Sequence, residues 1–118
     1  MAATREDADL MVHILQWGST MGVEEALSKV FSDDFNPDTA SENEPHVRKV
    51  LYFGETIGTF VKQGVLDRDL VLDLFAIGFS WKRVKPAALR VRERTGEPRM
   101  YENYEALANA SLGAAVGV

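Results

Sequence analysis

The sequence has no cysteine and only two histidines among its 118 residues. The absence of thiols excludes disulfides, thiolate zinc sites, iron–sulfur clusters and cysteine nucleophiles. Phosphate-binding glycine loops, the Gly-x-Ser-x-Gly motif and the His-Glu-x-x-His motif are also absent, which disfavours common nucleotide enzymes, serine hydrolases and zinc proteases. The sequence therefore assigns no catalytic, cofactor-binding or metal-binding residue, and it favours a non-enzymatic protein.

Long hydrophobic runs are also missing. No window approaches the apolar length of about 20 residues that spans a bilayer, and the N-terminus lacks the basic start and apolar stretch of a secretory signal. With the lack of cysteine, this predicts a soluble cytoplasmic protein that has no membrane partner.

Charge is distributed unevenly within an ordinary globular composition of 46% hydrophobic and 26% charged residues. The net charge is −5, yet residues 81–99 carry seven basic and two acidic side chains. A length of 118 residues suits one domain, and we expect residues 1–118 to form it. The overall negative charge argues against bulk attraction to DNA or to anionic membranes.

Apolar residues recur at helical spacing along most of the chain, and no segment alternates as a strand does. The pattern predicts an all-α fold with about six helices in a single compact domain, its long central helix at about 42–63. The other expected helices cover about 7–19, 23–31, 67–78 and 80–95, and a last one begins near Tyr101. In the fourth helix, Leu74 is expected on the inner face.

Helix ends and close contacts also have signals in the sequence. Ser41 and Glu44 have the spacing of a capping box, and Asp67 is placed to cap the fourth helix. Pro86 either kinks the fifth helix or marks its start. Gly54 and Gly58 lie four residues apart on the central helix, which predicts that another helix approaches closely there.

The polar segment 32–43 contains Asp34, Asn36 and Asp38, which resemble the start of an EF-hand calcium loop. However, Thr39 stands where the motif needs glycine, and Pro45 where it needs glutamate. The segment is therefore interpreted as a loop whose Asp and Asn side chains form turns.

Two side chains are weak candidates for acid–base chemistry: His13, which lies one helical turn from Asp9, and Glu55, which interrupts an apolar run. The other histidine, His46, opens another helix, and two histidines without cysteine make a poor zinc set. No nucleophile accompanies either histidine, so we interpret His13 as an ordinary surface contact. Glu55 is expected to have a structural role, in which it faces water or pairs with a cation.

The basic segment 82–94 is the strongest functional feature of the sequence. Arg83, Arg90 and Arg94 share one helical face with Arg92 beside it, and a helix with a short break precedes them, as in a helix-turn-helix. The acidic remainder of the chain and Pro86 argue against DNA. We expect these four arginines to form an interaction face that complements acidic groups of the chain or of a partner.

Several motifs of residues 51–107 carry a family resemblance. These are Tyr52-Phe53-Gly54-Glu55, Val61-Lys62-Gln63-Gly64-Val65-Leu66-Asp67, Trp81, Arg92 and Tyr101-Glu102-Asn103-Tyr104-Glu105-Ala106-Leu107. In these motifs the chain resembles a bacterial family of small all-helical proteins classed as a domain of unknown function. The resemblance implies an all-α fold and no particular reaction. It also suggests that Glu55, Trp81, Arg92 and Tyr104 form a packed polar–aromatic junction.

Together these observations favour a soluble helical protein-interaction module that associates with a protein partner or with itself as a homodimer. One alternative is nucleic-acid binding through the basic helix 82–94. A second is a small-molecule-binding protein or enzyme with a pocket between helices, in which Glu55 or His13 would exchange protons.

Overall fold

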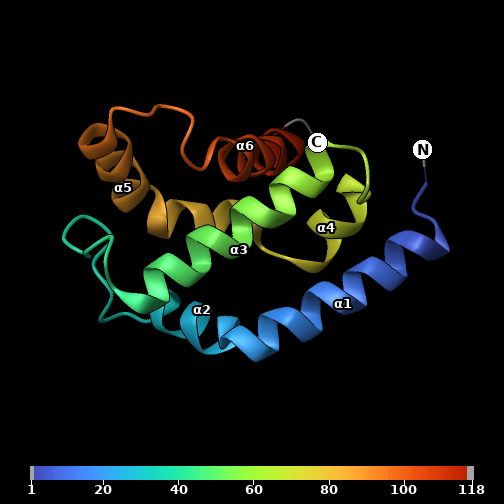
Figure 1. The fold of residues 1–118 in the computed structure, drawn as a ribbon, viewed down its shortest axis with the longest axis horizontal. Coiled ribbons are helices and arrows are strands. Elements are labelled where there is room, and N and C mark those ends of the chain that lie inside the picture. Colours follow the sequence, from blue (N-terminus) through green and yellow to red (C-terminus); the bar gives the residue numbers. More distant parts are fainter. Residues whose placement is uncertain (1, 117–118) are drawn as a thin grey trace.

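Six helices make up the chain in a computed structural model that describes the backbone of residues 2–116 and the side chains of residues 2–111 (Figure 1). They are α1 (Arg5–Met21), α2 (Val23–Phe31), α3 (Pro45–Lys62), α4 (Arg68–Leu74), α5 (Ile77–Thr95) and α6 (Glu102–Val116). The described residues contain no strand, so the all-α prediction is confirmed. The radius of gyration of 14.1 Å is close to the ~13.5 Å of a compact domain of this length.

The central helix is α3, as the sequence predicts. It crosses the middle of the molecule in Figure 1 and packs against α2, α5 and α6. Its apolar face is fully buried at Val47, Leu51 and Ile57, where it meets Trp81 and Val84 of α5 in one core. Helices α2, α5 and α6 are therefore positioned by their contacts with α3, whereas α1 packs against α2.

The predicted close approach at Gly54 and Gly58 is confirmed, and the neighbouring helix is α6. A Cβ atom added to Gly54 would come within 2.4 Å of the Tyr104 ring. One added to Gly58 would come within 2.4 Å of the Asn103 carbonyl oxygen. These distances are too short for any carbon contact, so only glycine lets α6 lie this close to α3.

Two of the helix starts differ from expectation. Asp67 caps α4 as predicted, because its carboxylate accepts the Leu70 N–H at 2.9 Å. The capping box predicted at Ser41 and Glu44 is wrong: the hydroxyl of Ser41 accepts the Asn43 N–H in a turn, and α3 begins at Pro45. A capping box forms instead at Thr4 and Asp7, and it starts α1 two residues before the predicted boundary.

The junction of α4 and α5 also differs from expectation. The chain becomes extended at Phe75, so α4 ends at Leu74 and that side chain is 52% exposed rather than inward. Helix α5 begins already at Ile77 and includes Gly78. Pro86 lies in the middle of α5 and therefore does not mark its start.

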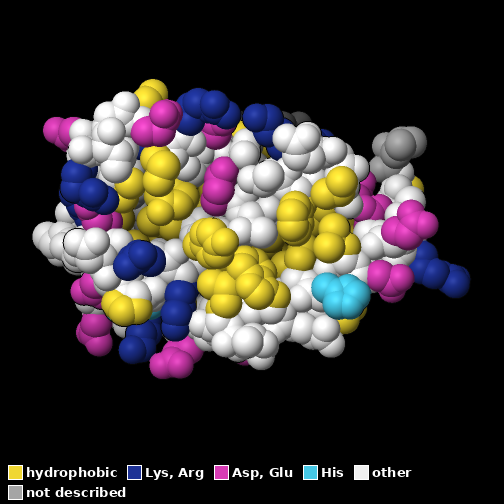
Figure 2. Space-filling model, in the orientation of Figure 1, with side chains coloured by type: hydrophobic (Ala, Val, Ile, Leu, Met, Phe, Trp, Pro, Cys, Tyr) yellow, Lys and Arg dark blue, Asp and Glu magenta, His cyan; other side chains and the backbone are white. Residues whose placement is uncertain are grey.

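Hydrophobic side chains gather over the middle of α3 and beside α1 on the face seen in Figure 2, with most charged side chains toward its edges. On α3, Tyr52 is exposed, and its ring lies edge-on to that of Trp17 at 5.9 Å. Within residues 2–116, no helix combines the length and apolar character needed to cross a membrane.

The Asp7 carboxylate joins the starts of two helices and makes stability depend on pH. It accepts N–H bonds from Thr4 in its own capping box and from Asp67 at the start of α4. These bonds, chiefly those from Thr4, hold the pKa of Asp7 below its ordinary value. The stability they add is present above that ordinary value and is lost as pH falls through the lowered one.

We expect Asp7→Asn, which mimics the protonated side chain, to lower the melting temperature at pH 7. The difference from the wild type should shrink as the pH is lowered toward 3, because the wild-type carboxylate then loses its charge. Thermal unfolding of both proteins across this range measures the difference. A constant difference at every pH would contradict this role of the Asp7 charge.

Candidate functional site

The side chain of Arg83 points from α5 into the end of α2. Its guanidinium donates to the carbonyl oxygens of Val30 at 2.7 Å, Ser32 at 3.0 Å and Phe35 at 3.0 Å. It also lies over the Phe35 ring, with its central carbon 5.3 Å from the ring centroid. Because helix ends leave carbonyls without partners, Arg83 both closes α2 and shapes the loop that follows.

Two further arginines of α5 hold the rest of this loop. Arg90 donates to the carbonyl oxygens of Asp38, at 3.1 Å, and Ala40. Arg94 pairs with the carboxylate of Glu42 at 2.6 Å. The loop of residues 32–43 is therefore fixed along α5 by three successive side chains on one helical face.

The fourth arginine serves a different connection. Arg92 donates to the Met100 carbonyl at 2.8 Å and pairs with Glu105 at 2.9 Å, and its side chain is only 15% exposed. It thereby joins the C-terminal half of α5 to the turn that leads into α6. The four predicted arginines thus divide between two segments of their own chain.

Glu55 of α3 binds the first turn of α6. Its carboxylate accepts the backbone N–H of Asn103 at 3.0 Å and of Tyr104 at 2.9 Å, and the Asn103 side-chain amide at 3.0 Å. Among residues 2–111 no cation pairs with Glu55, and its partly buried carboxylate is bound by backbone donors instead. A side chain of one helix here does what an N-cap residue does within a helix, and the anion suits the positive end of the α6 dipole.

The backbone before α6 is strained at the same place. Tyr101 has a φ of +62°, in the left-handed region that residues other than glycine seldom adopt. Burial raises the pKa of the Tyr101 hydroxyl above its ordinary value, and this effect outweighs the opposite one of the nearby Arg48 charge. The bonds from Glu55 and Arg92 lie on either side of this residue in the sequence and hold the strained turn in place.

Tyr104 is the buried centre of this region. Its ring lies against Gly54 and meets the Trp81 ring edge-on at a centroid distance of 4.9 Å. Its hydroxyl is hydrogen-bonded to that of Ser80, and burial raises its pKa far above the ordinary value. Glu55 and Trp81 therefore both contact Tyr104, whereas Arg92 reaches its neighbour Glu105.

The remaining sequence candidates lie apart from one another. His13 is exposed on α1 and makes no hydrogen bond or ion pair within residues 2–111, whereas His46 lies 2.6 Å from the Glu44 carboxylate. In the loop, Asn36 accepts the Asp38 N–H in a turn. No three acidic or histidine side chains of the described residues gather as metal ligands would.

An apolar groove that the sequence does not predict lies between α1, α2 and the α4–α5 junction. Two adjoining cavities of about 300 and 70 Å³ share Leu27, Phe53 and Phe75 as walls, and Phe31 lies on the rim. The Phe31 ring stacks on that of Phe79 at 5.0 Å, although the two residues are 36% and 54% exposed. We call this surface the phenylalanine groove.

A signal for this groove is present in the sequence but is ambiguous. Phe31 ends one amphipathic segment, and Phe75 and Phe79 lie on either side of a helix boundary. Helical periodicity predicts on which face of its own helix each ring lies, but it does not predict which residues of another helix the ring contacts. Only the packing of α2 against α5 brings Phe31 and Phe79 together.

We expect Glu55→Ala to destabilise the protein by about 3 kcal/mol, because two backbone donors of α6 lose a charged acceptor. Glu55→Gln keeps a hydrogen-bond acceptor and should therefore lose less stability than Glu55→Ala. Glu93→Ala, at an exposed position of α5, provides a matched control that should change stability little. Urea unfolding measures the free energy of unfolding of all three variants. Equal losses in Glu55→Ala and Glu93→Ala would contradict the capping role of Glu55.

The family model described as "Domain of unknown function (DUF4760)" matches residues 4–111. Neither a curated protein nor a solved structure matches the chain.

Proposed function

The chain belongs to the family described as a domain of unknown function (DUF4760), and from this premise we propose that it is a protein-interaction module that self-associates through the phenylalanine groove. The observation that carries the proposal is the exposed stack of Phe31 and Phe79 beside an apolar cavity. Large aromatic side chains are rarely left in contact with water beside a pocket unless another surface covers them.

The surroundings of the groove suit a second copy of the same chain. Leu15 of α1 lines one end and is 42% exposed, and Leu74 is exposed at the end of α4. Acidic Glu24 lines the groove, and basic Lys82 follows Phe79 by one helical turn. Charges of both signs around one apolar patch suit a two-fold dimer, because the rotation can bring the acidic part of the rim onto the basic part.

The bonds of the basic helix support protein interaction over nucleic-acid binding. Phosphate contacts need cationic side chains that are free to reach the backbone of the nucleic acid. Here Arg83, Arg90 and Arg92 donate to carbonyl oxygens of the chain itself, and Arg94 pairs with Glu42. Binding to DNA through this face would require these bonds to break.

We predict that the wild-type protein forms a dimer. Phe79→Ser should raise the dissociation constant of this dimer at least about tenfold, since central aromatic residues dominate interface energies. Leu89→Ser is a matched control, because Leu89 is also exposed on α5 but lies outside the groove. Sedimentation equilibrium over a wide concentration range measures both.

Two results would contradict the proposal. One is a wild-type protein that stays monomeric at the highest concentration, and the other is a dimer that Leu89→Ser or Tyr52→Ser weakens as much as Phe79→Ser. The second result would place the interface on a different apolar surface.

We further expect no binding to generic duplex DNA at low salt, where the electrostatic attraction is largest. Fluorescence anisotropy of a labelled duplex measures this. Binding that weakens steeply with added salt would instead support the basic helix as a nucleic-acid interface.

A further inference from the structure

A second groove lies between the end of α3, the start of α4 and one face of α6. Its volume is about 480 Å³, which is within the range of small-molecule sites. We define the α4–α6 groove by six of its lining residues, which are Val61, Lys62, Arg68, Ala106, Leu107 and Ala110. We propose that the α4–α6 groove binds a single-chain amphiphile with an anionic head group, such as a medium-chain carboxylate.

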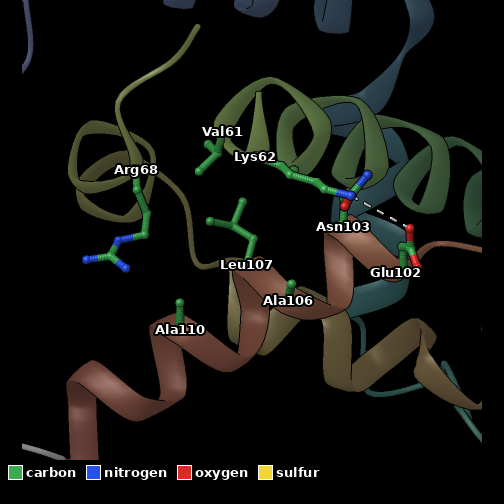
Figure 3. Close-up of a pocket in the computed structure, with 9 residues that line it drawn as sticks. Val61, Lys62, Arg68, Glu102, Asn103, Ala106, Leu107 and Ala110 are labelled. Atoms are coloured by element: carbon green, nitrogen blue, oxygen red, sulfur yellow. Dashed lines mark ion pairs between the residues drawn. The ribbon is translucent and has the colours of Figure 1, made fainter. Parts of the chain in front are cut away.

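The middle of the groove is apolar. Val61 of α3 and Leu107 of α6 lie between Arg68 on one side and Lys62 on the other (Figure 3). On α6, Ala106 and Ala110 are one turn apart, and their short side chains leave the hollow open. The tight contact of Gly58 with the Asn103 backbone brings α3 and α6 together beside this space. An alkyl chain is the kind of group that such walls would cover.

The groove is lined by two cations, Lys62 and Arg68, and by one carboxylate, that of Glu102. Lys62 lies 4.0 Å from Glu102, and Arg68 lies 3.7 Å from Asp69, its sequence neighbour. Both cations are more than half exposed, and ion pairs of this kind contribute little to stability. Each cation can therefore turn to a ligand without breaking a bond that the fold needs.

This availability separates the two cations from three arginines of α5. Arg83 and Arg90 donate to backbone carbonyls, and Arg92 is largely buried. In a chain with a net charge of −5, an available cation at either end of an apolar hollow favours a negative group attached to an apolar one.

The size of the groove favours a single chain over a peptide helix. One turn of a helix about 10 Å wide fills about 420 Å³, so the groove would receive only one turn. Peptide helices that dock in grooves use anchors over two or more turns. A flexible alkyl chain needs no such length.

The test uses the full chain and the soluble probe decanoate, below the concentration at which it forms micelles. We expect ¹⁵N–¹H spectra to show saturable shifts at residues 58–62, 68 and 106–110. Decyltrimethylammonium, which has the same chain and the opposite charge, should bind at least about tenfold more weakly, and acetate should not bind.

Variants separate the two parts of the site. The cation that the single carboxylate reaches is identified by substitution: Arg68→Gln or Lys62→Gln, but not both, should weaken decanoate binding about threefold to fivefold, as exposed ion pairs do, whereas Lys85→Gln on α5 should have no effect. Ala106→Leu fills the hollow and should weaken binding at least about tenfold. Asn109→Leu makes a similar change at an exposed position of α6 outside the groove, and it should leave binding unchanged.

Several results would overturn the proposal. They are the absence of saturable shifts in the groove, equal binding of the cationic probe, and wild-type affinity in Ala106→Leu. Preferential binding to vesicles of anionic phospholipid over free decanoate would also overturn it, because the ligand would then be a membrane surface. The two grooves share no lining residue, so failure here would leave the proposed dimer untouched.

Discussion

The contact between α3 and α6 is the constraint on which the rest of the structure depends. Gly54 and Gly58 let the backbone of α6 reach α3, and Glu55 between them binds the free N–H groups of its first turn. Both effects need the same register, because a shift of one helix along the other would separate the carboxylate from its donors. Close packing and helix capping thus select one arrangement, with Tyr104 buried at its centre.

The arginines of α5 extend this arrangement to the irregular parts of the chain. Loops and helix ends carry carbonyl oxygens that have no partner within a helix. Arg83 and Arg90 supply donors to those of residues 30–40, and Arg92 supplies one to Met100. A segment that looks on sequence like a face for binding other molecules therefore also binds parts of its own chain. This is why the two grooves, which the arginines do not line, carry the functional proposals.

Much of the fold could be predicted from local sequence. The helical periodicity identified all six helices, with the bounds 23–31 of α2 and the cap at Asp67 confirmed. The errors lie at helix ends, where several side chains compete for the same backbone groups. Ser41 has the spacing of a helix cap, but its hydroxyl accepts the Asn43 N–H in a turn, and α3 begins at Pro45.

The candidate sites were much less predictable, because they consist of side chains from segments far apart in the sequence. The residues determined by themselves that the chain is helical, that it lacks thiol chemistry, and that its basic groups are concentrated in one helix. Only the tertiary structure decided that Phe31 meets Phe79 and that Arg68 lines an apolar hollow together with residues of α3 and α6. The physical reason is that periodicity reports which side of a helix is apolar, whereas a groove depends on the distance and angle between helices, which their packed side chains set.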